Sequence, residues 1–250
     1  MPTPTLYFET KDELPAFGDV MMAIDGFEAL DYNTKGFNWM QSKSPVYPNF
    51  RYEYTDVVVG SVQAMQRHFQ SVGRLPDPID YPACLGKDIT GRHVERMVLE
   101  RVPQVFHLDK QELFIKPART KQQGFEAKVY GRKDIERLIT EYGADTWVYV
   151  SEPMEIRAEF RVFVHNGAIV DIRRYAGSWR SSTPPIFWIE RLIAAYHDAP
   201  VAYTVDVAML NHQGVKLVEI NDFWAIGAYG LDPVLYATML RDRYRQIRGW

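Results

Sequence analysis

Cysteine is almost absent from this chain of 250 residues, which contains only Cys84. A single cysteine cannot form a disulfide within the chain, and this composition favours a reducing, cytoplasmic setting. The sequence also lacks any apolar run approaching the roughly 18 residues that a membrane-spanning helix needs, so we expect no membrane partner. Its histidines are scattered without the spacing of a zinc site.

A marked excess of charge of either sign is missing as well. The 29 lysines and arginines and the 32 aspartates and glutamates give a net charge of −3, which argues against nucleic acid as a partner. Hydrophobic residues make up 46% of the chain and charged residues 24%, as in ordinary globular proteins. Length and composition therefore allow one large domain or two small ones with a proper core.

Two β-branched segments, 201–210 and 215–220, are separated by a short polar turn and predict a β-hairpin. Asp206 interrupts the first segment, and Glu219 and Asn221 lie at the end of the second. Side chains alternate along a strand, so Glu219 and Asn221 point to the same face. Two carboxylates and an amide oxygen suit Mg²⁺ that is shared with substrate phosphates, although a hairpin with solvated edge charges would have the same pattern.

Residues 1–82 have the pattern of a small α/β unit. A strand-like segment at 52–59 runs into Gly60-Ser61 and then into an apolar helical pattern. A helix that begins where a strand ends is a common ligand-binding position, and Ser61 acting as a plain helix cap explains the pattern equally. Residues 74–82 carry three prolines, which cannot continue regular structure, and we expect them to link this unit to residues 83–250.

A strand predicted at 112–117 ends in Lys116 and a proline, and a second strand is expected at 125–130. The loop between them is polar and carries Arg119 and Lys121. Such a loop could close over a triphosphate, and a hairpin with a solvated basic tip would have the same composition. Elsewhere the pattern of apolar and charged residues predicts a strand at 147–150 and helices at 91–101, 132–143, 186–196 and 233–246.

The strand predicted at 155–164 alternates between an apolar face and an ionic face. Asn166-Gly167 follows it and favours a two-residue hairpin turn. With such a turn, Arg174 shares the ionic face with Arg161, while Arg173 points away. A slip of one residue in the pairing would exchange Arg174 for Arg173.

The order of these segments resembles the ATP-grasp superfamily, and within it the clade named for two arginines and a lysine. The resemblance covers residues 83–250 and likens residues 1–82 to the small domain that precedes such ligases. It implies an α/β (α+β) ATP-grasp fold in which two subdomains clasp ATP. It also implies roles for the matching residues: Lys116 on the ATP phosphates, Val150, Ser151 and Glu152 on adenine, Arg161 and Arg174 on the transferring phosphoryl group, and Asp206, Glu219 and Asn221 on Mg²⁺.

Two features depart from the pattern of common ATP-grasp enzymes. An earlier lysine for the α-phosphate is missing, with Lys87 as the candidate, and the loop at 118–124 has a single glycine. The resemblance implies an ATP-dependent ligase that joins a small-molecule or peptide carboxylate to an amine through an acyl phosphate. A phosphotransferase that stops at a phosphorylated product, or a nucleotide-binding module without turnover, are the alternatives.

Overall fold

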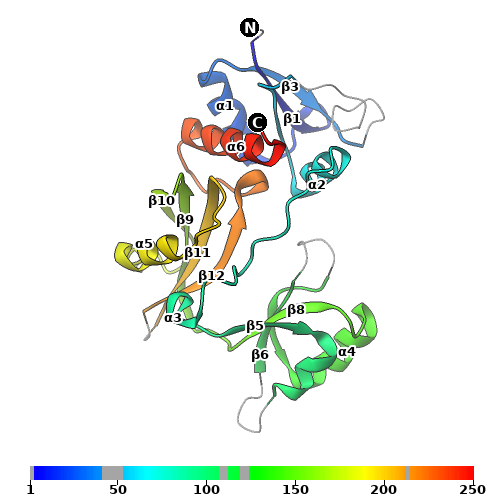
Figure 1. Cartoon of the computed structure of the whole chain (residues 1–250), viewed down its shortest axis with the longest axis vertical. Helices are drawn as coiled ribbons and strands as arrows, with labels where there is room; N and C mark the ends of the chain where they lie inside the picture. Colours follow the sequence, from blue (N-terminus) through cyan, green and yellow to red (C-terminus); the bar gives the residue numbers. More distant parts are fainter. Residues whose placement is uncertain (1–2, 41–52, 107–111, 119–123, 212–213) are drawn as a thin grey trace.

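The computed structural model describes residues 3–40, 53–106, 112–118, 124–211 and 214–250. These residues form three four-stranded sheets with helices packed against them, which confirms the predicted mixed α/β class (Figure 1). No helix among the described residues has both the length and the apolarity to cross a bilayer.

The first sheet is built from the N-terminal part of the chain. Its central strand β1 pairs in parallel with β3 and β4 and antiparallel with β2. The side chain of Ser61 accepts a hydrogen bond from the amide of Ala64 at 3.3 Å, so Ser61 is the cap of helix α2. The elements are β1 (Thr5–Lys11), β2 (Leu14–Pro15), α1 (Gly18–Ala29), β3 (Asn33–Phe37), β4 (Val57–Val59) and α2 (Val62–Ser71).

The second sheet has the strand order β10-β9-β11-β12 and is antiparallel throughout. Apolar side chains of α5, such as Ile189 and Leu192, pack on one face against Phe160 and Val162. The strands β9, β11 and β12 and the helices α5 and α6 were predicted to within two residues. The elements are β9 (Ile156–His165), β10 (Ala168–Gly177), α5 (Ile186–Ala195), β11 (Ala202–Leu210), β12 (Val215–Asp222), the 3-10 turn η2 (Phe223–Ala225) and α6 (Pro233–Arg248).

The third sheet has the order β5-β8-β6-β7 and packs on α4. The prediction of a helix at 91–101 was wrong, because Val94, Met97 and Val98 have helical spacing but lie in strand β5, which pairs with β8. The predicted strand at 125–130 begins late, at Lys128. The elements are β5 (Val94–Val98), the 3-10 helix η1 (Leu99–Gln104), β6 (Glu112–Pro117), β7 (Lys128–Gly131), α4 (Arg132–Tyr142) and β8 (Trp147–Ser151), while the preceding short helix α3 (Lys87–Thr90) packs on the core of the second sheet through Ile89.

The C-terminal helix α6 returns to the N-terminal sheet (Figure 1). Its side chains Tyr236 and Leu240 share one core with Leu6 and Val57. Helices α1 and α6 approach so closely that a Cβ atom added at Gly26 would lie 1.9 Å from the carbonyl oxygen of Pro233. The N-terminal unit is therefore packed against the last helix of the chain, while the division after residue 82 stays a prediction.

His68 lies in this core, where its Nε2 is 2.9 Å from the hydroxyl oxygen of Tyr244. Burial lowers the pKa of His68 to about 3, because the charged form would lose its hydration. In the unfolded chain its pKa returns to about 6.5, so between these two values the unfolded state binds a proton that the native state does not. The free energy of unfolding should therefore fall as the pH drops below about 6.5, by at most about 1.4 kcal/mol per pH unit from this residue.

Urea titrations of the wild type and of His68→Gln, from about pH 7.5 to about pH 4.5, measure this contribution. The variant starts less stable but should lose stability less steeply than the wild type on acidification. Exposed His197 provides the control, because His197→Gln should keep the wild-type slope. Equal slopes for the wild type and His68→Gln would contradict the assignment.

Candidate functional site

A row of four charged residues crosses the second sheet from edge to edge. Arg173 on β10 lies directly opposite Arg161 on β9, Arg161 lies opposite Asp206 on β11, and Asp206 lies opposite Glu219 on β12. Directly opposed residues share a face of a sheet. The second sheet thus presents two cations and two carboxylates in line, on the face opposite α5.

At the centre of the row, Arg161 and Asp206 form a bidentate ion pair. Nε of Arg161 donates to Oδ1 at 2.8 Å, and a terminal nitrogen donates to Oδ2 at 2.6 Å. Both side chains are almost fully buried, with 5% and 2% of their area exposed. Burial lowers the pKa of Arg161, but the bonds and charge of Asp206 outweigh burial and raise it overall. Arg161 is therefore a fixed cation.

Asn221 joins the two carboxylates of the row. Its amide nitrogen donates to Oδ2 of Asp206 at 3.2 Å and to Oε1 of Glu219 at 2.8 Å. The three predicted metal ligands therefore come together as oxygen-bearing groups, which fits Mg²⁺, with the amide turned to present its oxygen. Within the described ranges, no three histidine, cysteine or carboxylate side chains gather as a metal site.

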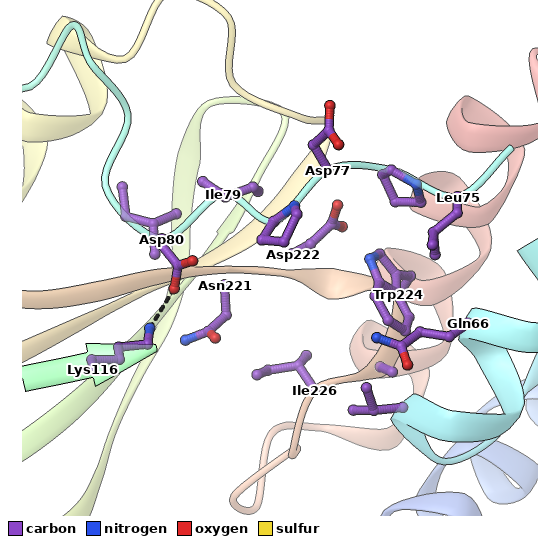
Figure 2. Close-up of a pocket in the computed structure, with 15 residues that line it drawn as sticks. Gln66, Leu75, Asp77, Ile79, Asp80, Lys116, Asn221, Asp222, Trp224 and Ile226 are labelled. Atoms are coloured by element: carbon purple, nitrogen blue, oxygen red, sulfur yellow. Dashed lines mark hydrogen bonds and ion pairs between the residues drawn. The ribbon is translucent and has the colours of Figure 1, made fainter. Parts of the chain in front are cut away.

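Lys116 reaches the row from the third sheet. Its ammonium group contacts the carboxylates of both Asp80 and Glu219, the latter at 2.5 Å. Burial lowers the pKa of Lys116, but the negative charges of Glu219 and Asp80 raise it well above its ordinary value. Figure 2 shows the Lys116–Asp80 contact with Asn221 beside it. The predicted phosphate-binding lysine thus contacts Glu219, one of the three predicted metal ligands.

A cavity of about 650 Å³ opens between the third sheet and β12, next to Lys116 and Glu219. Apolar side chains provide much of its wall, which is typical of small-molecule sites. Arg92 lies in this wall and is buried, donating to the carbonyl of Val218 at 2.8 Å and to the hydroxyl of Tyr81 at 2.5 Å. The other lining residues include Phe114, Pro117, Phe125, Glu152, Met154, Ile156, Glu159 and Tyr175.

Of the three residues predicted to contact adenine, one lines this cavity. Glu152 lines it, whereas Val150 and Ser151 are paired within the sheet between β5 and β6. Lys87 is an exposed residue of α3, and the cations that line the cavity among the described residues are Arg92, Lys116 and Lys128. The predicted basic loop with Arg119 and Lys121 lies outside the described residues.

The predicted placement of Arg174 on the ionic face was wrong. Asn166-Gly167 does form a two-residue turn, and both residues have positive φ. A bulge between Ile169 and Asp171 then shifts the pairing by one residue. As a result, Arg174 lies opposite Phe160 on the α5 side, and Arg173 takes its place opposite Arg161.

A second cavity, of about 310 Å³, reaches Arg161 from the N-terminal unit. Arg161 lies near the rings of Tyr229 and Tyr175, at 4.8 and 5.6 Å from their centres. One of its terminal nitrogens donates to the carbonyl of Gly227 at 3.3 Å. The guanidinium of Arg161 has five N–H groups, and three of them donate to Asp206 and Gly227. The other two have no hydrogen-bond partner among the described residues.

Sequence reasoning missed four residues of the site: Asp80, Tyr81, Arg92 and Tyr175. Tyr81 donates to the carbonyl of Val218 at 2.5 Å, and Tyr175 donates to Glu159 at 2.7 Å. Asp80 and Tyr81 belong to the segment that was interpreted as a linker, and only their polarity between prolines could have indicated a role.

The comparisons with known proteins identify the family of the chain. Residues 89–239 match the model of an ATP-grasp domain family, the second family of the clade named for two arginines and a lysine. This match spans more than half of the chain, and the chain therefore belongs to that family. No curated protein matches the sequence.

Solved structures with a similar fold extend over nearly the whole chain. The D-cycloserine synthetase DcsG has a TM-score of 0.66 at 14% identity, with 96% of this chain and 99% of that chain covered. A RimK domain ATP-grasp protein from Sphaerobacter thermophilus has a TM-score of 0.61 at 16% identity, covering 97% and 99%. The macrocyclase MdnC from Microcystis aeruginosa, bound to precursor peptide MdnA, has a TM-score of 0.56 at 12% identity, covering 96% and 99%. At these identities the likeness shows the ATP-grasp fold.

Proposed function

We propose that this protein is an ATP-dependent carboxylate–amine ligase that acts through an acyl phosphate. One observation carries the proposal: the 650 Å³ cavity ends at Lys116 and Glu219, where the charged row of the second sheet begins. A nucleotide in this cavity with its phosphates at Lys116 would place the terminal phosphate beside the row. We propose a cytoplasmic setting with ATP and Mg²⁺ as cofactors.

In the first step, a carboxylate oxygen of the substrate forms a bond to the γ-phosphorus and the bond to ADP breaks. The work of the protein is to position both groups and to compensate the spread negative charge. Lys116 would bind the phosphates, and Arg161 and Arg173 would stabilise the transferring phosphoryl group. Asp206, Glu219 and Asn221 would hold Mg²⁺, which neutralises phosphate charge when it is bound.

In the second step, the amine nitrogen bonds to the acyl carbon, phosphate leaves, and a proton is lost from nitrogen. We place the small-molecule or peptide carboxylate, together with the amine, in the 310 Å³ cavity, because Arg161 forms part of its wall. The N-terminal unit contributes Val59 to Val62 to the same wall, which supports a substrate-side role for residues 1–82. Two of the structural neighbours are a D-cycloserine synthetase and a macrocyclase bound with its precursor peptide, which is in keeping with a small-molecule or peptide substrate.

Purified protein with MgATP should release ADP only when a carboxylate and an amine are both present. A matrix of amino acids, short peptides and polyamines, read by ADP release and by mass spectrometry, tests this. We expect one amide product for each ADP. ADP release without an amine, accompanied by a stable phosphorylated product, would identify a phosphotransferase instead. Nucleotide binding with no ADP release under any pairing would identify a binding module.

A further inference from the structure

We propose that Asp80 is a positioning residue that holds the ammonium group of Lys116 when Glu219 turns to a metal ion. The inference rests on the proposed function and extends it to a residue of the segment that connects the N-terminal unit to the rest of the chain. Asp80 is outside the row of charges on the second sheet. It reaches the site from a different part of the chain (Figure 2).

The backbone fixes Asp80 at the edge of the second sheet. The amide of Ile220 donates to the carbonyl oxygen of Asp80 at 2.9 Å, in an isolated antiparallel bridge. Asp80 has a φ of 45°, in the left-handed region that residues other than glycine rarely adopt. Next to it, Tyr81 is anchored on the carbonyl of Val218 and packs edge-on against Tyr149, with ring centres 4.9 Å apart. The connecting segment therefore holds the carboxylate of Asp80 in one place.

Lys116 shares its ammonium group between Asp80 and Glu219, and all three side chains are largely buried at 12%, 12% and 15% exposed. An ammonium group has three donors. If Glu219 turns to Mg²⁺, Lys116 loses one carboxylate, and Asp80 remains to balance its charge while the other donors meet phosphate oxygens. Without the charge of Asp80, Lys116 would depend on Glu219 alone and would compete with the metal for it.

This role has a signature that a purely structural role lacks. In Asp80→Asn, the non-hydrolysable nucleotide AMPPNP without metal should bind as well as to the wild type or more tightly, because a negative charge near the phosphates is gone. AMPPNP with Mg²⁺ should bind more weakly. The gain in affinity that Mg²⁺ provides should therefore shrink by about tenfold, as expected for losing one charge-assisted contact.

Calorimetric titrations with AMPPNP, with and without Mg²⁺, measure this gain directly. Asp77→Asn is the matched control, because Asp77 is an exposed carboxylate of the same segment that points away from Lys116 (Figure 2). It should keep the wild-type gain. In the Lys116→Gln background, Asp80→Asn should have no further effect on the gain. If Asp80→Asn does not fold, Asp80→Ser replaces it in the same titrations.

An unchanged Mg²⁺ gain in the Asp80 variant would overturn the inference. An equal loss of affinity with and without metal is one such case, and it would indicate a structural role for Asp80. Failure of the wild type to bind AMPPNP at all would instead contradict the proposed function on which the inference rests.

Discussion

Glu219→Gln should reduce turnover by at least about 10²–10³-fold, the range seen when one preorganised electrostatic contact to a reacting group is removed. The substitution keeps the shape of the side chain and removes the negative charge that Mg²⁺ would need. Lys116 keeps the carboxylate of Asp80 as a partner, so the fold should remain intact. Steady-state ADP release and thermal unfolding separate the two effects.

Glu126→Gln is the matched control for this substitution. Glu126 lines the same cavity, but it is exposed and pairs with Lys128 at 2.9 Å, away from the charged row. It should retain activity within a few-fold of the wild type. Activity of Glu219→Gln within that same range would remove Glu219 from the metal site.

Asp206→Asn is a less clean test of the metal site, because loss of the Asp206 carboxylate is also expected to change the stability of the fold. From the sequence, removing a carboxylate from a metal site could stabilise the metal-free protein through relief of repulsion. In the structure, Asp206 instead balances buried Arg161. Breaking a buried pair on one side typically costs about 3–5 kcal/mol. Loss of activity in this variant would therefore mix catalysis with stability.

Arg173→Ala should lower kcat by about 10²–10³-fold and change KM little, because the charge that it stabilises is greatest in the transition state. Arg173 lies opposite Arg161 on the ionic face, and its side chain is 43% exposed and paired with Asp171 at 2.6 Å. Arg174→Ala should cost at most a few-fold, because Arg174 is exposed on the α5 side of the sheet. The two adjacent arginines thus control for each other.

Three outcomes of this pair are informative. A large loss for Arg173→Ala alone supports the bulged register. A large loss for Arg174→Ala alone would mean that the register without the bulge is the functional one. Small and equal effects would show that neither arginine acts on the phosphoryl group.

The sequence was sufficient to predict most of the helices and strands that have a clear local pattern of apolar and polar residues. The strand 112–117 was predicted with its bounds, and the hairpin with Glu219 and Asn221 on one face was predicted because alternation of side chains needs no tertiary information. That Asp206 lies opposite Glu219 follows from the pairing of β11 with β12. The segment 91–101 failed because its apolar spacing fits a helix, while pairing with β8 decides its structure.

The remaining errors and omissions share a physical cause. The bulge after Ile169 has no glycine or proline to mark it, so the exchange of Arg174 for Arg173 could not be read from the chain. Asp80 and Arg92 reach the site only because the connecting segment and the third sheet pack beside β12. Contacts of this kind depend on tertiary packing that local patterns do not encode.

A crystal structure of the protein with AMPPNP and Mg²⁺ would test the proposed nucleotide and metal sites together. Nucleotide should lie in the cavity lined by Phe114, Met154 and Val218, with adenine within hydrogen-bonding distance, about 3.2 Å or less, of the backbone at residues 150–152. Lys116 should contact phosphate oxygens, and the metal should contact Glu219. Nucleotide bound elsewhere, or a metal that does not touch Glu219, Asp206 or Asn221, would contradict the proposal.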